Sequence, residues 1–403
     1  MKQDNQILKI SDSVQWIGIM DYEIETFDIV MKTEYGTTYN SYFINAEKKA
    51  IIETSKEKFK DTYLNKVKRV CNPEEIEYII LNHTEPDHSG NLKHLLKLAP
   101  NATVVGSGQA LNYLNEMVGV PFKSQKVKDG DIIDLGNKKL KVIGAPNLHW
   151  PDTIYTYLEE DEILFTCDSF GAHYCNPAMF NDEVDNYNDA FKYYFDVILK
   201  PFSKFMLKAI DKISALEIKT ICPGHGPILR TNWKKYVDLS EQWAKEYLES
   251  TSTDKRVLLA YISAYGYTKE MAEKIKIGLG KFESIKIDII DIEDLLLGEL
   301  EEQLVKSDAL IIGSPTINQN TLLPVYKLFS VINPIRDKGK YFATFGSYGW
   351  SGEATNIIEA NLKNLKLKPV MESLSAKFFP HDEKSKQFIE FGEKFAELML
   401  AKE

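Results

Sequence analysis

The stretch "NHTEPDHSGN", residues 82–91, places His83, Glu85, Asp87 and His88 within six positions of one another. Ionisable side chains crowded in this way repel or desolvate one another unless a ligand binds them. The stretch follows the apolar run "EYIILN", which is typical of a buried strand. Because polar residues that follow a buried strand are often functional, the H-x-E-x-D-H pattern predicts a metal site. The alternative interpretation is a hydrogen-bonded turn with a helix cap at Asp87 or the following serine.

The composition predicts a globular protein of two domains. The chain has 403 residues, of which 44% are hydrophobic, enough for two separate cores. Its formal net charge of −10 disfavours nucleic acid and anionic lipid as partners. The apolar runs are far shorter than the roughly 20 residues of a membrane-spanning helix, and the N-terminus does not resemble a secretory signal. We therefore expect a cytoplasmic protein that does not bind a membrane.

The cysteines indicate a reducing compartment. Cys71, Cys167, Cys175 and Cys222 are sparse for this length and form no C-x-x-C pair. The sequence thus argues against a built-in site of four cysteines for iron or zinc. Any such centre must come from a separate partner.

The pattern of apolar residues changes near residue 252. Before it, strand-like stretches such as "TTYNSYFIN", "KAIIETS" and "EILFTCDS" dominate, with a long helical region predicted over 182–216. This pattern indicates sheets covered by helices. After the polar stretch "ESTSTDKR", apolar strands such as "VLLAYI" and "DALIIG" alternate with helices. That alternation is typical of a doubly wound parallel sheet. We therefore predict domains at 1–252 and 253–403.

Further metal-binding side chains follow other predicted strands. His149 follows "KLKVIGAP", Asp168 ends "EILFTCDS", and His225 lies in "TICPGHGP". Each alone is more typical of a structural residue, but together with residues 82–91 they predict one shared site. His173 is close to Asp168 in the sequence and is a candidate pocket residue.

The order of these residues resembles the metallo-β-lactamase superfamily, whose usual motif is H-x-H-x-D-H. Here Glu85 replaces the second histidine. A carboxylate hardens the site and makes it more negative, which favours two irons, with zinc as the alternative. Two metals at the usual spacing of about 3.5 to 4 Å need a bridging carboxylate, and Asp168 is the natural candidate.

The second domain contains a candidate phosphate-binding turn in "YISAYGYTKEM". Its backbone N–H groups and the following helix N-terminus suit a phosphomonoester, although an ordinary strand-to-helix turn is the alternative. Two later loops, "GSPTINQNT" and "FGSYGWSGEA", add small residues and aromatic rings; Trp350 has a core position as its alternative. The arrangement resembles flavodoxin with FMN at the switch point of the sheet. The candidate FMN-binding residues are Ser263, Ala264, Tyr265, Gly266, Tyr267, Thr268, Ser314, Pro315, Thr316, Ile317, Asn318, Ser347, Tyr348, Gly349, Trp350, Ser351 and Gly352.

Together the two halves resemble the flavodiiron proteins, also called A-type flavoproteins. The resemblance covers essentially the whole chain and includes "GTTYNSY", "NHTEPDHSG", "HWPDT", "GSPTIN" and "GSYGWSG". It implies an αββα sandwich of the metallo-β-lactamase type followed by a flavodoxin-like domain, with FMN and two irons as cofactors. The implied iron ligands are His83, Glu85 and His149 for one iron, Asp87 and His225 for the other, and Asp168 as the bridge. The resemblance places His88 beside the metals rather than on them, and makes Tyr193 a pocket candidate with core packing as the alternative.

The resemblance also implies the reaction and the partners. Two irons and a reduced FMN together supply the four electrons that reduce O2 to water, and the same site suits reduction of NO to N2O. The family arrangement implies a head-to-tail homodimer or a dimer of dimers, in which one subunit's FMN serves its partner's irons. Because the chain contains no rubredoxin-like pair of C-x-x-C motifs, the expected electron donor is a separate rubredoxin or a reduced deazaflavin.

Two other functions remain open from the sequence. One is a zinc-dependent hydrolase of the lactamase or glyoxalase II type with an accessory flavodoxin-like domain, which Glu85 disfavours. The other is a pure electron carrier on a structural lactamase-like scaffold, which the complete set of metal-binding side chains disfavours. Flavin absorbance would argue against the first, and a metal-free N-terminal domain would support the second.

Overall fold

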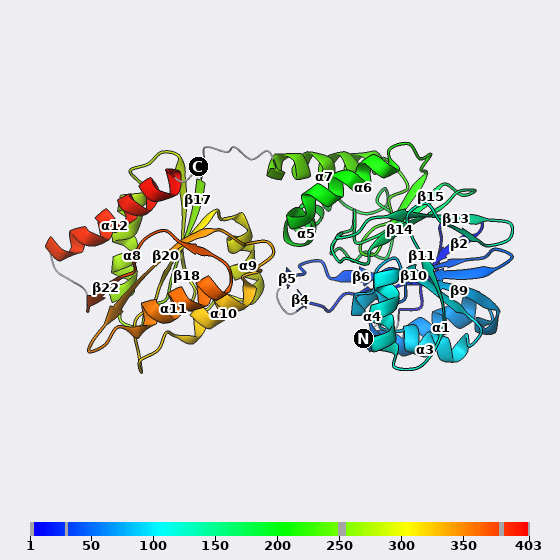
Figure 1. The fold of residues 1–403 in the computed structure, drawn as a ribbon, viewed down its shortest axis with the longest axis horizontal. Coiled ribbons are helices and arrows are strands. Elements are labelled where there is room, and N and C mark those ends of the chain that lie inside the picture. The colour runs from blue at the N-terminus through cyan, green and yellow to red at the C-terminus, as the bar shows by residue number, and fades with distance from the viewer. Residues whose placement is uncertain (1–3, 29–30, 249–254, 379–382, 402–403) are drawn as a thin grey trace. The chain divides into compact units, whose positions relative to one another are not determined.

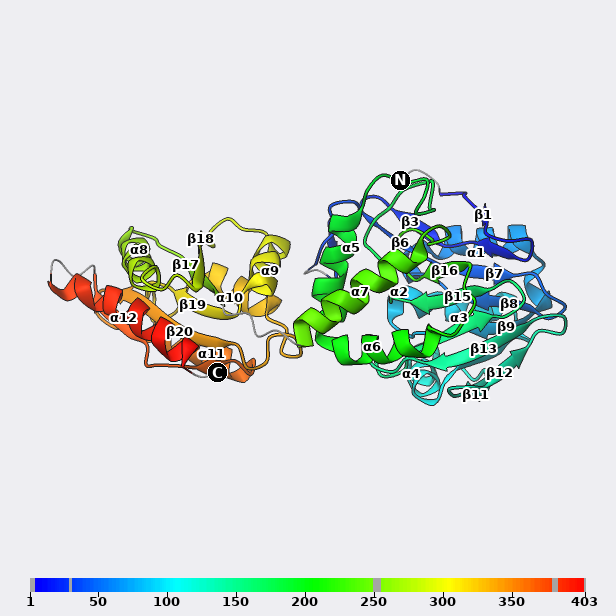
Figure 2. The same ribbon diagram turned by 90° about the horizontal axis from the view of Figure 1, so that it is seen from above.

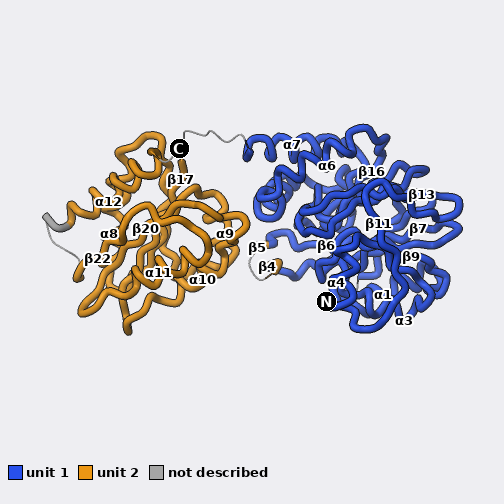
Figure 3. Tube along the Cα trace, in the orientation of Figure 1, with its two compact units in different colours: residues 1–25, 33–250 blue, residues 26–32, 251–403 orange. Residues whose placement is uncertain are grey.

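The computed structural model describes residues 4–28, 31–248, 255–378 and 383–401. The chain divides into two compact units, Met1–Glu25 with Thr33–Ser250 and Thr26–Lys32 with Thr251–Glu403 (Figure 3). The predicted boundary at residue 252 falls within 249–254, outside the described residues. No helix in the described part of the chain is long and apolar enough to cross a membrane.

Two packed sheets form the centre of the N-terminal unit. The first sheet has the order β1-β2-β7-β8-β9-β10-β11 and the second the order β12-β13-β14-β15-β16. The strands of the first sheet are β1 (Leu8–Lys9), β2 (Val14–Trp16), β7 (Tyr42–Ile44), β8 (Lys49–Ile52), β9 (Ile76–Ile80), β10 (Thr103–Ser107) and β11 (Lys123–Val127). Those of the second are β12 (Ile132–Asp134), β13 (Lys139–Gly144), β14 (Ile154–Leu158), β15 (Ile163–Cys167) and β16 (Thr220–Pro223). A small separate pair consists of β3 (Ile19–Asp21) and β6 (Thr37–Tyr39).

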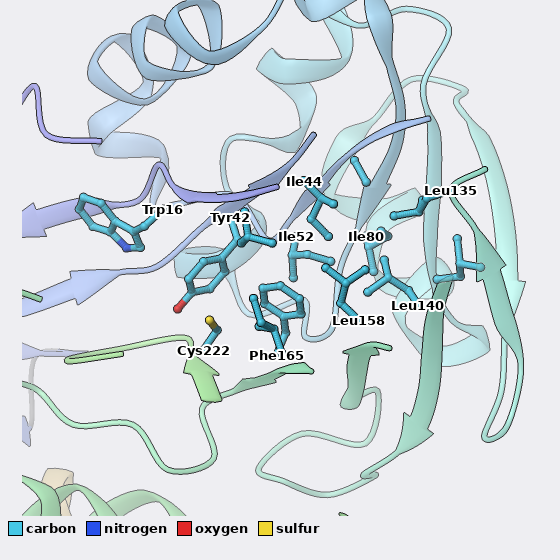
Figure 4. Packing of buried hydrophobic residues seen from close by; sticks show 14 of the residues in the cluster. Trp16, Tyr42, Ile44, Ile52, Ile80, Leu135, Leu140, Leu158, Phe165 and Cys222 are labelled. Carbon is cyan, nitrogen blue, oxygen red and sulfur yellow. The ribbon is translucent and has the colours of Figure 1, made fainter. Parts of the chain in front are cut away.

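Helices cover the outer faces of both sheets. Those on the side of the first sheet are α1 (Lys60–Val70), α3 (Leu92–Leu98) and α4 (Gly108–Val118), and those on the side of the second are α6 (Ser203–Ile213) and α7 (Trp233–Leu248) (Figures 1 and 2). Between the sheets, Ile52 and Ile80 pack with Leu140, Leu158 and Phe165, all of them buried (Figure 4). Apolar inner faces packed in this way remove the core side chains from water. The predicted αββα sandwich is confirmed.

The predicted strand over 37–45 is divided into two strands that belong to different sheets, β6 and β7. The break lies at Asn40, whose backbone N–H donates to Gly224 O at 2.8 Å. The Asn40 side-chain amide donates to the Pro223 and Gly226 carbonyls at 2.8 and 3.0 Å. These bonds hold the chain against the loop that carries His225, so the break helps to build the site.

The predicted helical region over 182–216 is also broken. It consists of α5 (Asn188–Tyr194), a π-helical turn (Phe195–Leu199), a 3-10 turn (Lys200–Phe202) and α6. Pro201 lies in the 3-10 turn, where the missing N–H of proline prevents a regular α-helix. The residues before Asn188 are not helical. The remaining short helices of this unit are the 3-10 turns Glu57–Phe59 and Pro73–Glu75 and the helix α2 (Pro86–Ser89).

The C-terminal unit is a parallel sheet in the order β18-β17-β19-β20-β21, with β22 also paired to β20. Its strands are β17 (Lys255–Tyr261), β18 (Ile285–Asp291), β19 (Ala309–Gly313), β20 (Tyr341–Tyr348), β21 (Lys368–Pro369) and β22 (Leu374–Lys377). Its helices are α8 (Tyr267–Leu279), α9 (Leu297–Lys306), α10 (Leu323–Val331), α11 (Glu353–Asn364) and α12 (Glu383–Leu400). The order confirms the predicted flavodoxin-like fold, whose switch point lies between β17 and β19.

Alternate residues of β17 serve two cores. Val257 and Leu259 pack with residues of α8 and α12, whereas Leu258 and Ala260 pack with residues of α9, α10 and α11. This two-residue period is that of a strand buried on both faces. The hairpin of β4 (Thr26–Phe27) and β5 (Met31–Lys32) also belongs to this unit. Gly298 of α9 lies so close to it that a Cβ would be 2.6 Å from Lys32 Cβ.

Candidate metal centre and cofactor-binding edge

The predicted metal-binding side chains meet at the carboxyl ends of four strands. The segment after β9 carries His83 and Glu85 and continues into α2, which carries Asp87 and His88. His149 lies between β13 and β14, Asp168 directly follows β15, and His225 follows β16. Strand ends that converge in this way bring residues far apart in the sequence into one site.

The first ligand group contains His83, Glu85, His149 and Asp168. Glu85 Oε2 lies 3.2 Å from His83 Nε2 and 2.9 Å from His149 Nε2. Asp168 Oδ2 lies 3.6 and 3.1 Å from the same two nitrogens. Two imidazole nitrogens and two carboxylates thus converge on one point, as the ligands of a metal ion do.

The second ligand group contains Asp87, His88 and His225. Asp87 Oδ2 lies 3.1 Å from His225 Nε2 and 3.4 Å from His88 Nε2. Asp168 Oδ1 faces the same two nitrogens, at 3.5 Å from His225 and 2.9 Å from His88. The two oxygens of Asp168 therefore face different ligand groups, which is the geometry of a bridging carboxylate between two metals.

Gly224 keeps this arrangement compact. A Cβ at this position would lie 2.7 Å from His88 Cε1 and 3.3 Å from Asp168 Oδ1. No side chain fits in that space without moving the imidazole or the carboxylate. Gly224, the first glycine of "PGHGP", is therefore needed for the close approach of the backbone to the site.

Buried charges and unpaired atoms show that the site suits cations. Burial alone would lower the pKa of His83, but the neighbouring carboxylates of Asp152 and Glu85 outweigh it and raise the pKa well above its usual value. In the same way, Asp168 and Glu85 raise the pKa of His149 to about 9 against the effect of burial. Among the described residues, Asp87 Oδ1 is buried without a hydrogen-bond partner. In the absence of metal, protons on the imidazoles balance the negative charge of the carboxylates. A pair of metal cations suits the positions between these imidazoles and carboxylates.

Outer groups orient the imidazoles. His83 Nδ1 lies 3.5 Å from Asp152 Oδ1, and Asp152 Oδ2 accepts from the Thr84 N–H and hydroxyl, both at 2.8 Å. His225 Nδ1 lies 2.6 Å from Thr38 O, so Nδ1 donates and Nε2 is left to face the carboxylates. Such partners fix the tautomer and the ring orientation of a metal-ligating histidine.

The two predicted catalytic candidates lie in different surroundings. His88 is fully buried, with Nε2 directed at Asp87 and Asp168, and its other neighbours Glu53 and Cys167 are also buried. Tyr193 is only partly buried. Its neighbour Tyr194 is 1% exposed, and its ring lies 4.8 Å from His173 and 6.0 Å from His225.

Tyr194 and His173 line the site beside His225. The Tyr194 hydroxyl is buried without a hydrogen-bond partner among the described residues. His173 Nδ1 lies 2.9 Å from Thr37 Oγ1. Burial, reinforced by the neighbouring His225, lowers the pKa of His173 well below its usual value, so this ring is neutral. The sequence did not identify Tyr194. Which of the two adjacent tyrosines faces the site depends on the rotation of the helix about its axis, and the sequence left that rotation undetermined.

The predicted FMN-binding residues lie at the carboxyl edge of the parallel sheet. Residues 263–268 include the turn after β17 and the first two residues of α8, residues 314–318 follow β19, and residues 347–352 extend from the end of β20 to the residue before α11. Gly266 has φ +85 and directly precedes α8, and a Cβ there would meet no atom within 4 Å. The turn thus has free space beside the first N–H groups of a helix, which suits a phosphate.

Hydrogen bonds connect the three loops. The Thr268 and Ser347 hydroxyls lie 2.9 Å apart, and Thr316 N donates to Ser347 O at 2.8 Å. The aromatic rings of this edge are exposed, with Trp350 at 85% and Tyr265 at 79%. The core alternative for Trp350 is therefore wrong. Large apolar side chains so exposed at a polar edge are typical of a binding site for a flat ring.

The two halves of the chain match two family models. Residues 37–226 match the model described as ODP family beta lactamase, and residues 259–392 match that of flavodoxin. The chain is 39% identical over 401 residues to Flavo-diiron protein FprA2 of Clostridium acetobutylicum. This similarity covers 96% of this chain and 98% of the relative. It is 35% identical to Type A flavoprotein fprA of Rhodobacter capsulatus, over 96% of this chain and 90% of the relative.

Solved structures extend this similarity to three dimensions. The flavodiiron protein from Giardia intestinalis superposes with a TM-score of 0.80 at 29% identity, covering 98% of this chain and 97% of the other. The rubredoxin oxygen:oxidoreductase from Desulfovibrio gigas superposes with a TM-score of 0.81 at 25% identity, covering 98% and 99%. Both similarities cover nearly the whole of this chain.

Proposed function

Because this chain belongs to the flavodiiron protein family, and is therefore an oxidoreductase with FMN and a non-haem diiron centre, we propose that it reduces O2 to water or NO to N2O. The observation that carries this proposal is Asp168, whose two oxygens face two ligand groups, one of which contains Glu85 in place of a histidine. The family supports oxidoreductase chemistry over the hydrolase and the pure electron carrier.

We assign His83, Glu85 and His149 to one iron, Asp87 and His225 to the other, and Asp168 to both. When bound, the iron pair supplies electrons and an open coordination position for a diatomic molecule. Three carboxylates suit iron in its higher charge state better than a set of neutral imidazoles does. His88 lies beside Asp87 and Asp168, where it supports both carboxylates from the buried side.

The burial of the ligands indicates how a gas enters. Glu85 and His149 have side chains that are 16% and 21% exposed, whereas those of Asp168 and His225 are 2% exposed. The entrance is therefore beside Glu85 and His149, and the opposite side of the site excludes water. On the buried side the Tyr194 hydroxyl, within the field of Asp168, holds a proton close to the reacting molecule. Burial is the main reason that the pKa of Tyr194 is raised well above its usual value.

The electron path extends beyond one subunit. We propose a head-to-tail homodimer, or a dimer of dimers, in which the FMN of one subunit reduces the irons of its partner. The donor to FMN is a separate rubredoxin or reduced deazaflavin, and the name of the Desulfovibrio gigas relative supports rubredoxin and O2. All four cysteines lie in the described residues and none forms a disulfide, which supports a cytoplasmic location.

The test is gas consumption by the protein as purified without air. With reduced rubredoxin as donor, we expect uptake of O2 without release of peroxide, or formation of N2O from NO, in protein that contains about two irons and one FMN per chain. An O2 electrode, a peroxide assay and gas chromatography measure the three quantities. Active protein that contains zinc in place of iron would contradict the proposal.

Metal uptake is expected to release protons in a pH-dependent way. Burial would lower the pKa of His149, but the neighbouring Asp168 and Glu85 outweigh it and raise this pKa to about 9. The His149 ring therefore holds a proton at pH 7 without metal, and ferrous iron must displace that proton. We expect iron affinity to rise from pH 6 to 9 and proton release to shrink towards pH 10. Anaerobic calorimetry in buffers of different ionisation enthalpy measures both, and a pH-independent affinity would contradict this expectation.

A further inference from the structure

Aromatic side chains extend from the metal site to the surface of the N-terminal unit. His173 lies against His225 at 5.3 Å and against Tyr194 at 4.8 Å, both between ring centroids. The next residue in the chain is Tyr174, whose ring lies 5.3 Å from that of Tyr35. Tyr35 and Tyr174 are also joined by a β-bridge. The series thus consists of two ring contacts, Tyr194 with His173 and Tyr174 with Tyr35, joined by the peptide bond between His173 and Tyr174.

Exposure rises along this series. Tyr194 is 1% exposed, Tyr174 is 8% exposed and Tyr35 is 38% exposed. The series therefore connects a fully buried position beside a metal ligand to a position that solvent reaches.

Tyr35 has a proton acceptor at the exposed end. Its hydroxyl donates to Asp189 Oδ2 at 2.6 Å. By contrast, the Tyr194 hydroxyl has no hydrogen-bond partner among the described residues. A tyrosine that can pass its proton to a carboxylate is easier to oxidise by one electron than a tyrosine that must keep its proton in an apolar core. An electron vacancy formed near Tyr194 is therefore most stable at Tyr35.

The other aromatic contacts do not provide an equivalent route. Tyr174 also lies 5.2 Å from Tyr187, which stacks on Tyr236. The ring that contacts both Tyr236 and Trp243, however, is Phe191. A phenylalanine ring is too difficult to oxidise to carry an electron vacancy. Lys192 Nζ also lies 5.1 Å from the Trp243 ring, and its positive charge opposes oxidation of the indole.

We propose that Tyr194, Tyr174 and Tyr35 form a relay that removes oxidising equivalents from the metal site when O2 is reduced with too few electrons. This second activity rests on the proposed reduction of O2. The oxidant would be partially reduced oxygen, a one-electron acceptor that incomplete reduction would leave in the site. It gains one electron, Tyr35 loses one, and the phenolic proton of Tyr35 passes to Asp189. Tyr194 and Tyr174 each pass on one electron and end unchanged.

The relay is reset at the surface. A thiol-class reductant in solution gives one electron to the Tyr35 radical, and Asp189 returns the proton to the phenolate oxygen. The thiol becomes a thiyl radical and loses its own proton to water, so atoms and electrons balance. The benefit to the enzyme is that oxidation occurs at a side chain that can be repaired rather than at His83, His149 or His225.

The test uses the iron-loaded holoenzyme with its flavin left oxidised. Anaerobic protein that has been reduced only at the irons is mixed with O2, frozen rapidly, and examined by electron paramagnetic resonance. In a second sample, iron-loaded oxidised protein is mixed with peroxide, which generates an oxidant without any O2-reducing activity. We expect a tyrosyl radical in both samples, and growth on ring-deuterated tyrosine narrows its signal.

Two variants and one control locate the radical. Tyr35→Phe removes the exposed end and is expected to lose most of the radical signal and to inactivate after fewer turnovers. Asp189→Asn keeps a hydrogen-bond partner but removes the proton acceptor, and we expect the same direction of change. The matched control is Tyr247→Phe, because Tyr247 is 39% exposed in the same unit and lies outside the relay. It should keep the wild-type signal and lifetime.

The outcomes separate this inference from the proposed function. If peroxide gives a radical that depends on Tyr35 while the protein reduces no O2, the relay stands and the reductase proposal fails. If O2 is reduced normally and neither oxidant gives a radical that Tyr35→Phe diminishes, the relay is overturned. A radical that is lost equally in Tyr247→Phe also overturns it.

Discussion

Asp168→Ala is expected to remove both irons and to abolish reduction of O2 and NO while FMN stays bound. Asp168 is the residue whose two oxygens face both ligand groups, at 2.9 Å from His88 Nε2 and 3.1 Å from His149 Nε2. Loss of an outer-shell partner alone costs roughly 10- to 100-fold in metal affinity, and loss of a bridging ligand must cost more. FMN is unaffected because its candidate loops belong to the other compact unit.

A graded comparison shows whether bridging is the cause. Asp152→Asn weakens the support of His83 and the hydrogen bonds from Thr84 but removes no ligand, so it should lower iron affinity without emptying both positions. Metal analysis, flavin absorbance and near-ultraviolet circular dichroism are measured on all three proteins. Asp168→Ala protein that still holds two irons would show that Asp168 does not bridge. Loss of flavin together with iron would show that the two units do not bind their cofactors independently.

The metal site could be predicted from the sequence because few other roles require these residue types in this order. The residue types in H-x-E-x-D-H have few structural explanations, and His149, Asp168 and His225 each follow a strand. Strand ends converge in a sandwich of two sheets, so the sequence alone was enough to bring these side chains together. The turn that is the candidate phosphate site was predictable as a turn for a similar reason, because Gly266 lies at a strand-to-helix connection with a backbone conformation that L-residues disfavour.

Other features depended on tertiary contacts that leave no local signal. The strand break at Asn40 exists because distant carbonyls of Pro223 and Gly226 accept its amide hydrogens. The association of Thr26–Lys32 with the C-terminal unit depends on the close approach of Gly298, more than 260 residues away. The choice between Tyr193 and Tyr194 depends on helix phase, and α5 with its π-helical continuation changes that phase within a few residues.

Glu85→His would restore the H-x-H-x-D-H pattern of zinc hydrolases in this chain, and we expect it to change the metal rather than the fold. Glu85 precedes α2 with φ −52 and ψ 142, a conformation that histidine adopts without strain. Its side chain is 16% exposed, so the substitution lies at the entrance of the site and not in the packed core. The variant should fold and retain FMN. Glu116→His, on the exposed face of α4, is the control for the effect of a new histidine.

The chemical effect follows from charge. Glu85 Oε2 faces His83 and His149, so its replacement leaves one metal position with neutral imidazoles and only the shared Asp168 as an anionic ligand. Such a set favours zinc and stabilises ferric iron less well. We therefore expect higher zinc uptake and loss of most O2 and NO reduction, measured by metal analysis and by gas consumption with reduced rubredoxin. Turnover close to wild type in the Glu85→His protein would mean that the carboxylate does not select the chemistry. The selectivity would then have to come from the groups that Glu85 does not contact, Asp87 and His225 in the second ligand group, and Asp87→His would be the next variant to measure.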